Sequence, residues 1–143
     1  MTRALYKALQ ASGMKLQNYG TVLATIADKD KEEALPLIRR FYNLGFNIEA
    51  TIGTAMFLKR NGIRTHALSK ISDGSEEIPN ALRQGHIAYV INTKDPSADS
   101  SDGIRIRQIS TEYNVSLFTA LDTVKALLDV LEETTLTIST IDA

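Results

Sequence analysis

The chain has 143 residues, of which 43% are hydrophobic and 23% are charged, and its formal net charge is -1. This length suits one globular core, and the charge balance excludes the broad basic surface that nucleic acid or an anionic membrane attracts. No apolar run reaches the length of a membrane span, and the absence of cysteine excludes a disulfide framework, a thiolate nucleophile and a cysteine-bound metal. We therefore expect one cytoplasmic domain without a nucleic-acid or membrane partner.

The two ends of the chain differ from its middle. Residues 1–19 read as a lead-in helix and linker, with apolar residues at helical spacing and Gly13 as a stop, ahead of a domain over residues 20–143. This linker-like start leads us to expect a piece of a longer protein. Residues 134–141 are rich in threonine and isoleucine, which favours either a further edge strand or a segment that docks elsewhere.

Short apolar segments alternate with stretches of helical periodicity along the rest of the chain, which is the rhythm of βαβ units. The expected strands cover residues 21–27, 47–50, 65–68, 87–92 and 115–118. The expected helices cover residues 31–44, 54–61, 78–84, 102–113 and 119–131. Because parallel neighbours need crossover helices that cover the sheet, the predicted fold class is α/β: a three-layer doubly wound sandwich with a mainly five-stranded parallel sheet.

The loop at residues 51–54, Thr-Ile-Gly-Thr, is the most informative candidate for ligand binding. Open α/β sheets bind ligands at the carboxyl ends of their strands. Here Gly53 lets backbone N–H groups approach a phosphate, the hydroxyls of Thr51 and Thr54 can donate to it, and the following helix adds unpaired amides. Taken alone, Thr54 is more often a helix N-cap and Gly53 a turn glycine.

Polar side chains also follow the neighbouring strands. Lys31 and Lys70 can flank a phosphate as point charges, and Asn92 and Thr93 are placed to bond a ribose or a base. Each of these residues has an ordinary explanation as a solvated lysine or a strand end. Only their convergence on one edge of the sheet favours a site for a nucleotide or a sugar phosphate.

We predict no catalytic or metal-binding set. His66 falls within an expected strand and His86 just before one, so both lie away from the candidate edge. The carboxylates on loops and helix starts are Asp28, Asp30, Asp73, Asp95 and Asp102. Helix capping and solvation explain most of them.

Four segments carry a family resemblance: DKDKEEAL, GFNIEATIGTAMFLKRNGI, LSKISDGSEEIPNALRQGHIAYVINT and SDGIRIRQ. Together they resemble the methylglyoxal-synthase-like domain that closes the large subunit of carbamoyl-phosphate synthase, and the resemblance runs through nearly the whole chain. The pattern DGxEExPNxxxxGxI discriminates best, because ATxGTA and VINT are shared by several relatives.

The resemblance implies an allosteric domain without catalytic residues that binds a nucleotide effector. Uridine monophosphate (UMP) is favoured, with inosine monophosphate (IMP) or phosphoribosyl pyrophosphate as alternatives. Carried over by position, the phosphate contacts fall on Thr25, Lys31, Thr51, Gly53, Thr54 and Lys70, and the base or ribose contacts on Asn92, Thr93 and Lys94. Some members have a hydroxyl residue in place of Lys94, whose charge either favours a more highly phosphorylated effector or faces solvent.

The resemblance also implies a larger assembly. Its partners are the remaining domains of the large subunit and the glutaminase small subunit, and the parent ligase serves pyrimidine and arginine biosynthesis. No cofactor belongs to this domain, since ATP, Mg and K are used elsewhere in the parent enzyme.

Three alternatives stay open. A methylglyoxal synthase, which is a phosphate-eliminating lyase, needs a histidine after the first strand, a Gly-Gly-Asp loop after the third and a His-Asp pair after the fourth. This chain has Ala27-Asp28, Asp73-Gly74 and Asn92-Thr93 at those places. The cyclohydrolase domain of late purine synthesis carries a basic loop where SDGSEEIPN is acidic. The third alternative is a docking module with a vestigial pocket.

Overall fold

The computed structural model describes residues 17–70, 74–93 and 101–142, so the expected lead-in helix at residues 2–12 lies outside it. The strands in the described part are β1 (Thr21–Thr25), β2 (Asn47–Thr51), β3 (His66–Leu68), β4 (Ile87–Asn92) and β5 (Ser116–Phe118). A 3-10 turn, η1 (Asp28–Asp30), leads into the first of the helices. The helices are α2 (Lys31–Asn43), α3 (Ile52–Arg60), α4 (Glu77–Arg83), α5 (Ser101–Glu112) and α6 (Leu121–Asp142).

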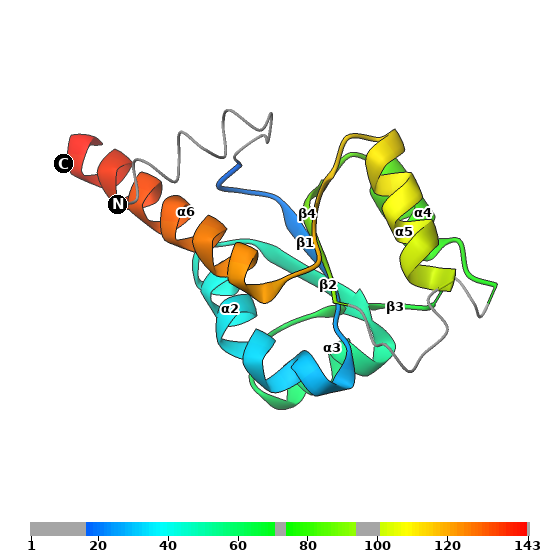
Figure 1. Cartoon of the computed structure of the whole chain (residues 1–143). Coiled ribbons are helices and arrows are strands. Elements are labelled where there is room, and N and C mark those ends of the chain that lie inside the picture. Colours follow the sequence, from blue (N-terminus) through cyan, green and yellow to red (C-terminus); the bar gives the residue numbers. More distant parts are fainter. Residues whose placement is uncertain (1–16, 71–73, 94–100, 143) are drawn as a thin grey trace.

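The sheet is entirely parallel and has the order β3-β2-β1-β4-β5. The chain moves outward from β1 to β3 on one side and from β4 to β5 on the other, so the winding reverses between β1 and β4. Helices α2, α3 and α6 cover one face of the sheet, and α4 and α5 cover the other, on the right of Figure 1. The predicted doubly wound three-layer fold is therefore confirmed.

Two apolar clusters fill the spaces between these layers. The strand period of two divides β1 between them, since Val22 and Ala24 join the α2, α3 and α6 cluster while Leu23 joins the α4 and α5 cluster. Strand β4 is buried along its whole length, which is typical of a central parallel strand covered on both faces.

Four aromatic rings pack together in the cluster between the sheet and helices α2, α3 and α6. The Tyr89 ring centroid lies 6.1 Å from that of Phe41, 6.0 Å from that of Phe46 and 6.0 Å from that of Phe118. The buried Tyr89 hydroxyl accepts a hydrogen bond from the Gln17 amide at 2.7 Å and donates one to the Gln17 carbonyl at 2.8 Å. Burial raises the pKa of this hydroxyl. The hydroxyl thus fixes the backbone ahead of β1.

The C-terminal segment is helical, so the prediction of an edge strand at residues 134–141 is wrong. Helix α6 begins at Leu121 and continues through that segment to Asp142. Its apolar side chains between Val124 and Leu131 are buried, and Arg40 of α2 donates to Glu132 at 3.0 Å and to Asp129 at 2.8 Å. Since nucleation is the costly step, a docked helix extends through threonine and isoleucine at a small cost per residue. Among the described helices, none has the length and apolarity that crossing a bilayer requires.

Candidate functional site

The carboxyl ends of β1 and β4 meet where the winding of the sheet reverses. Thr25 and Asn92, the last residues of the two strands, pair directly across the sheet. Chains that leave two adjacent parallel strands in opposite directions open a crevice at this point, which is where α/β sheets bind ligands. Three of the predicted site residues, Thr25, Asn92 and Thr93, are brought together here.

A row of hydrogen bonds joins the β1 end to the β4 end. The Thr25 hydroxyl donates to Asn92 Oδ1 at 2.7 Å, the Ala27 amide donates to Thr93 Oγ1 at 2.8 Å, and the Thr93 amide donates to the Thr25 carbonyl at 3.2 Å. Asn92 is 7% exposed and Thr93 is 9% exposed. Because the Asn92 oxygen is held by Thr25, the amide nitrogen keeps its donors for another group. No bond to a described residue occupies that nitrogen.

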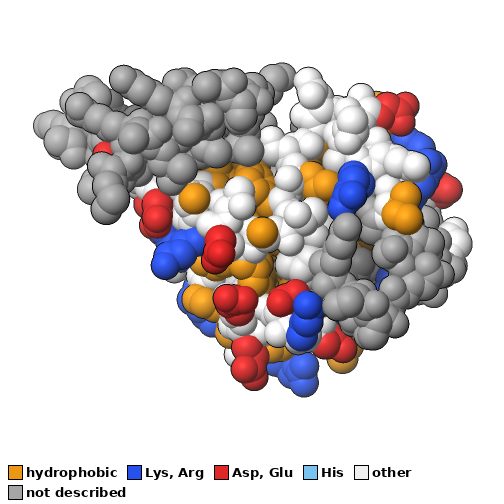
Figure 2. All heavy atoms as spheres, in the orientation of Figure 1, with side chains coloured by type: hydrophobic (Ala, Val, Ile, Leu, Met, Phe, Trp, Pro, Cys, Tyr) orange, Lys and Arg blue, Asp and Glu red, His pale blue; other side chains and the backbone are white. Residues whose placement is uncertain are grey.

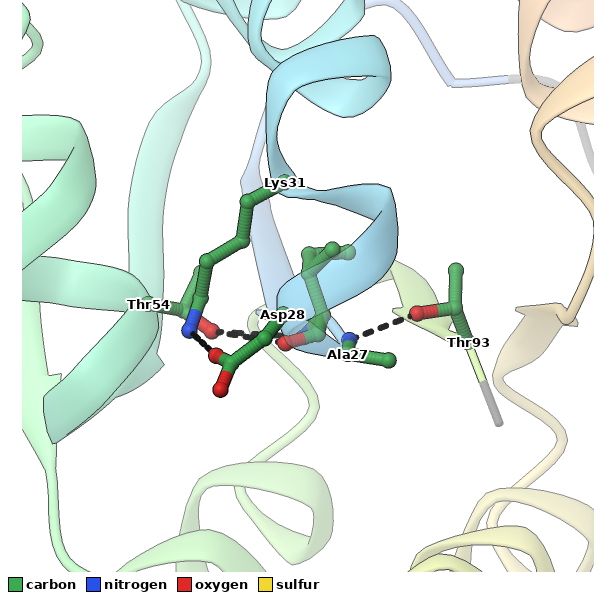
Figure 3. Close-up of polar contacts among 6 residues, drawn as sticks. Ala27, Asp28, Lys31, Thr54 and Thr93 are labelled. Atoms are coloured by element: carbon green, nitrogen blue, oxygen red, sulfur yellow. Dashed lines mark hydrogen bonds and ion pairs between the residues drawn. The ribbon is translucent and has the colours of Figure 1, made fainter. Parts of the chain in front are cut away.

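Thr54 ties α3 to the same edge. Helix α3 begins at Ile52 with Thr51 as its N-cap, so the explanation of Thr54 as an N-cap is wrong. The Thr54 hydroxyl instead accepts from the Ile26 amide at 3.3 Å and donates to the Ile26 carbonyl at 3.5 Å, and the residue is 2% exposed (Figure 3). To donate to a phosphate as predicted, the Thr54 hydroxyl would have to give up its hydrogen bond to the Ile26 carbonyl.

Lys31 places its ammonium group beside the first turn of α3. A Cβ atom at Gly53 would lie 3.9 Å from Lys31 Nζ. Gly53 itself is the second residue of α3 and its φ is not positive, so its explanation as a turn glycine is wrong as well. The Lys31 side chain is only 18% exposed, and it forms an ion pair with Asp28, whose side chain is 92% exposed (Figure 3). The sequence reasoning missed this pair, although its i,i+3 spacing is a signal that could have found it.

The remaining predicted residues are spread along the edge. Thr51 ends β2 and makes no side-chain hydrogen bond to α3. Lys70 is exposed and follows β3, which lies two strand positions, or about 10 Å, from β1. Lys94 lies outside the described residues. The structure thus places Lys70 at the far end of the row.

The two histidines lie toward the amino ends of the strands and away from the candidate site, as predicted. His66 is the first residue of β3, and His86 precedes β4, with its Nε2 atom 3.3 Å from Glu49 Oε2. Within the part of the chain that the structure describes, no group of three histidine or carboxylate side chains is arranged to hold a metal ion.

The charge around the candidate site is mixed. Carboxylates flank the lysines of η1 and the first turn of α2, at Asp28, Asp30, Glu32 and Glu33. Figure 2 shows acidic and basic side chains interspersed on this face of the molecule. Attraction of an anion therefore depends on local groups, namely Lys31 and the amides that begin α3, and not on a broad basic surface.

Comparison with known proteins identifies the family. The MGS-like domain matches residues 33–119, which is more than half of the chain and includes most of the candidate residues. The crystal structure of methylglyoxal synthase from Elizabethkingia anophelis NUHP1 is similar with a TM-score of 0.65 and 17% sequence identity, over 79% of this chain and 79% of that chain. At this identity the likeness is one of fold. On the family match, the chain belongs to the MGS-like domain family.

Proposed function

We propose that this domain binds a nucleotide effector where β1 and β4 separate and that it regulates the large subunit of a carbamoyl-phosphate synthase. The observation that carries the proposal is the position of the Lys31 ammonium over Gly53, at the same end of the sheet as the row formed by Thr25, Asn92 and Thr93. A cation, a helix start and amide donors at one edge suit a phosphate joined to a polar ring.

The phosphate would lie at the start of α3. The first N–H groups of a helix have no partner within the helix, and the Thr51 N-cap makes no side-chain bond to them. Lys31 supplies the charge, and the strand-end residues Asn92 and Thr93 supply groups for the ribose or base. Lys70 and Lys94 would extend the site toward further phosphates. UMP is the favoured effector, with IMP and phosphoribosyl pyrophosphate as the other candidates.

Regulation requires the effector to bind two states of a larger enzyme with different affinity. The partners in this proposal are the remaining large-subunit domains and the glutaminase small subunit, in the cytoplasm. ATP, Mg and K would serve the chemistry of those domains, while this domain binds its ligand without turnover.

One observation favours a second candidate, a phosphate-eliminating lyase of the methylglyoxal synthase type. Such a reaction needs a base near the bound phosphate, and the carboxylate of Asp28, the first residue of η1, contacts Lys31. The fold likeness to a methylglyoxal synthase points the same way. Formation of methylglyoxal from dihydroxyacetone phosphate, lost in Asp28→Asn, would establish this activity in place of the regulatory one.

Calorimetric titration tests the main proposal directly. UMP, IMP and phosphoribosyl pyrophosphate are each titrated into the wild-type chain, Lys31→Ala and Lys29→Ala. Lys29→Ala is the matched control, because Lys29 is an exposed lysine of η1 and its substitution removes the same charge two residues away from Lys31. Loss of one charge-assisted hydrogen bond predicts about tenfold weaker binding in Lys31→Ala and less than about twofold in Lys29→Ala. A folded wild-type chain that binds none of the three refutes the proposal.

A further inference from the structure

The ion pair between Lys31 and Asp28 stands at the point where a ligand phosphate is proposed to bind. The lysine side chain is 18% exposed and lies against Gly53, whereas the aspartate side chain is 92% exposed. Figure 3 shows the carboxylate of Asp28 at the Lys31 ammonium. A phosphate that approaches Lys31 at the start of α3 therefore meets a carboxylate already bound there.

We propose that Asp28 is an internal counter-ion of Lys31, which a phosphate-bearing ligand must displace and which thereby sets the charge that the site accepts. The inference deepens the proposed function and rests on it, because it assigns a specificity-determining residue to the same site. Asp28 acts here by competition: its carboxylate and the ligand are both acceptor-only anions and require the same ammonium group.

The backbone of Asp28 is fixed, so only its side chain needs to move. On one side of it, the Ala27 amide is held by Thr93 Oγ1 at 2.8 Å. On the other side, the Asp30 amide bonds to the Ala27 carbonyl at 2.9 Å and closes the η1 turn. The Asp28 carboxylate is mostly exposed and can rotate into solvent, and the incoming phosphate then takes its place as the acceptor beside the Lys31 ammonium. Lys31, which is largely buried, stays over Gly53.

This arrangement discriminates between ligands by charge. A phosphate dianion attracts the ammonium more strongly than one carboxylate does and repels that carboxylate away from the site. A neutral nucleoside does neither, so Lys31 stays paired with Asp28 and the nucleoside gains no contact with the cation. Removing the negative charge at Asp28 should therefore tighten phosphate binding and leave nucleoside binding unchanged.

The test compares Asp28→Asn with Glu32→Gln. Glu32 is the matched control, because it is an exposed carboxylate in the first turn of α2 that loses the same charge, and no ion pair joins it to Lys31 among the described residues. Inorganic phosphate is titrated into each chain by NMR of the backbone amides, and UMP and uridine are titrated by calorimetry. We expect phosphate to bind about three- to tenfold more tightly to Asp28→Asn and to change less than about 1.5-fold in Glu32→Gln. Uridine should bind the wild-type chain and both variants with the same affinity.

Three results would overturn the proposal that Asp28 is a displaceable counter-ion of Lys31. The first is unchanged or weaker phosphate binding in Asp28→Asn, which would mean that Asp28 only positions Lys31. The second is an equal gain in Glu32→Gln, which would reduce the effect to net charge. The third is no response of any chain to phosphate. If phosphate binds Asp28→Asn more tightly but no nucleotide binds, the counter-ion stands and the nucleotide function fails. If UMP binds the wild type and Asp28→Asn equally, the function stands and the counter-ion fails.

Discussion

Replacing Tyr89 by Phe removes the hydroxyl oxygen and leaves the aromatic ring in place. The hydroxyl makes two short hydrogen bonds to the backbone of Gln17, at 2.7 and 2.8 Å, and the tyrosine is fully buried. A net contribution of about 0.5–1.5 kcal/mol for each bond predicts a loss of about 1–3 kcal/mol in the free energy of unfolding. For a domain of this size the same loss lowers Tm by about 3–10 °C.

Urea unfolding of Tyr89→Phe, with Tyr42→Phe as control, measures this loss. Tyr42 is 37% exposed and its hydroxyl makes no hydrogen bond with a described residue, so the same deletion there should change the unfolding free energy by less than about 0.5 kcal/mol. Faster exchange of the Gln17 amide in Tyr89→Phe would trace the loss to the backbone ahead of β1. If both variants unfold at the same urea concentration as the wild type with equal slopes, the tyrosine does not anchor that segment.

Three further perturbations test the layers of the fold. Above about pH 10, the ordinary pKa of tyrosine, the unfolded chain releases the Tyr89 proton, whereas the folded chain keeps it because its pKa is raised. The free energy of unfolding should therefore fall as pH rises toward the pKa of the folded state, and urea titrations should show a less steep fall in Tyr89→Phe. Leu127→Ala should cost about 3 kcal/mol by thermal unfolding, because Leu127 is 0% exposed, whereas Ile104→Ala at a 55% exposed position should cost under about 0.5 kcal/mol; equal losses would contradict the assigned core. Arg40→Met should cost about 1 kcal/mol or less in unfolding by urea and should abolish part of the salt dependence, since its partners on α6 are half exposed; an unchanged salt dependence would refute the ion pair's contribution.

The sheet was predictable because its signals are local. Each expected strand agrees with the structure to within two residues, since buried parallel strands read as short apolar runs and glycines such as Gly45, Gly62 and Gly85 follow the helices with positive φ. The α6 tail was not predictable from composition. Residues 134–141 favour a strand by propensity, but a helix already packed on α2 overrides that preference.

The candidate edge was predictable, whereas its bonding was not. The expected strand end pointed to Asn92, and the family resemblance pointed to Thr25. These two residues are 67 positions apart, and the Thr25 hydroxyl donates a 2.7 Å hydrogen bond to Asn92 Oδ1. No periodic pattern reports such a pairing, because it depends on which strands become neighbours. Thr54 shows the same limit: helix-start rules made it a cap, while the observed start at Ile52 turns its hydroxyl toward the β1 backbone.

These bonds also explain why one carboxylate can control the site. The Thr25, Thr54 and Thr93 hydroxyls each hold a neighbouring loop or strand end, so the edges of the candidate site resist rearrangement. The Lys31 side chain is 18% exposed and its ammonium lies against Gly53. Among the described residues, the Asp28 side chain combines high exposure with direct contact to the cation. A change of ligand charge preference should therefore follow substitution of Asp28 more readily than substitution of the threonines, whose loss disturbs the fold and the site together.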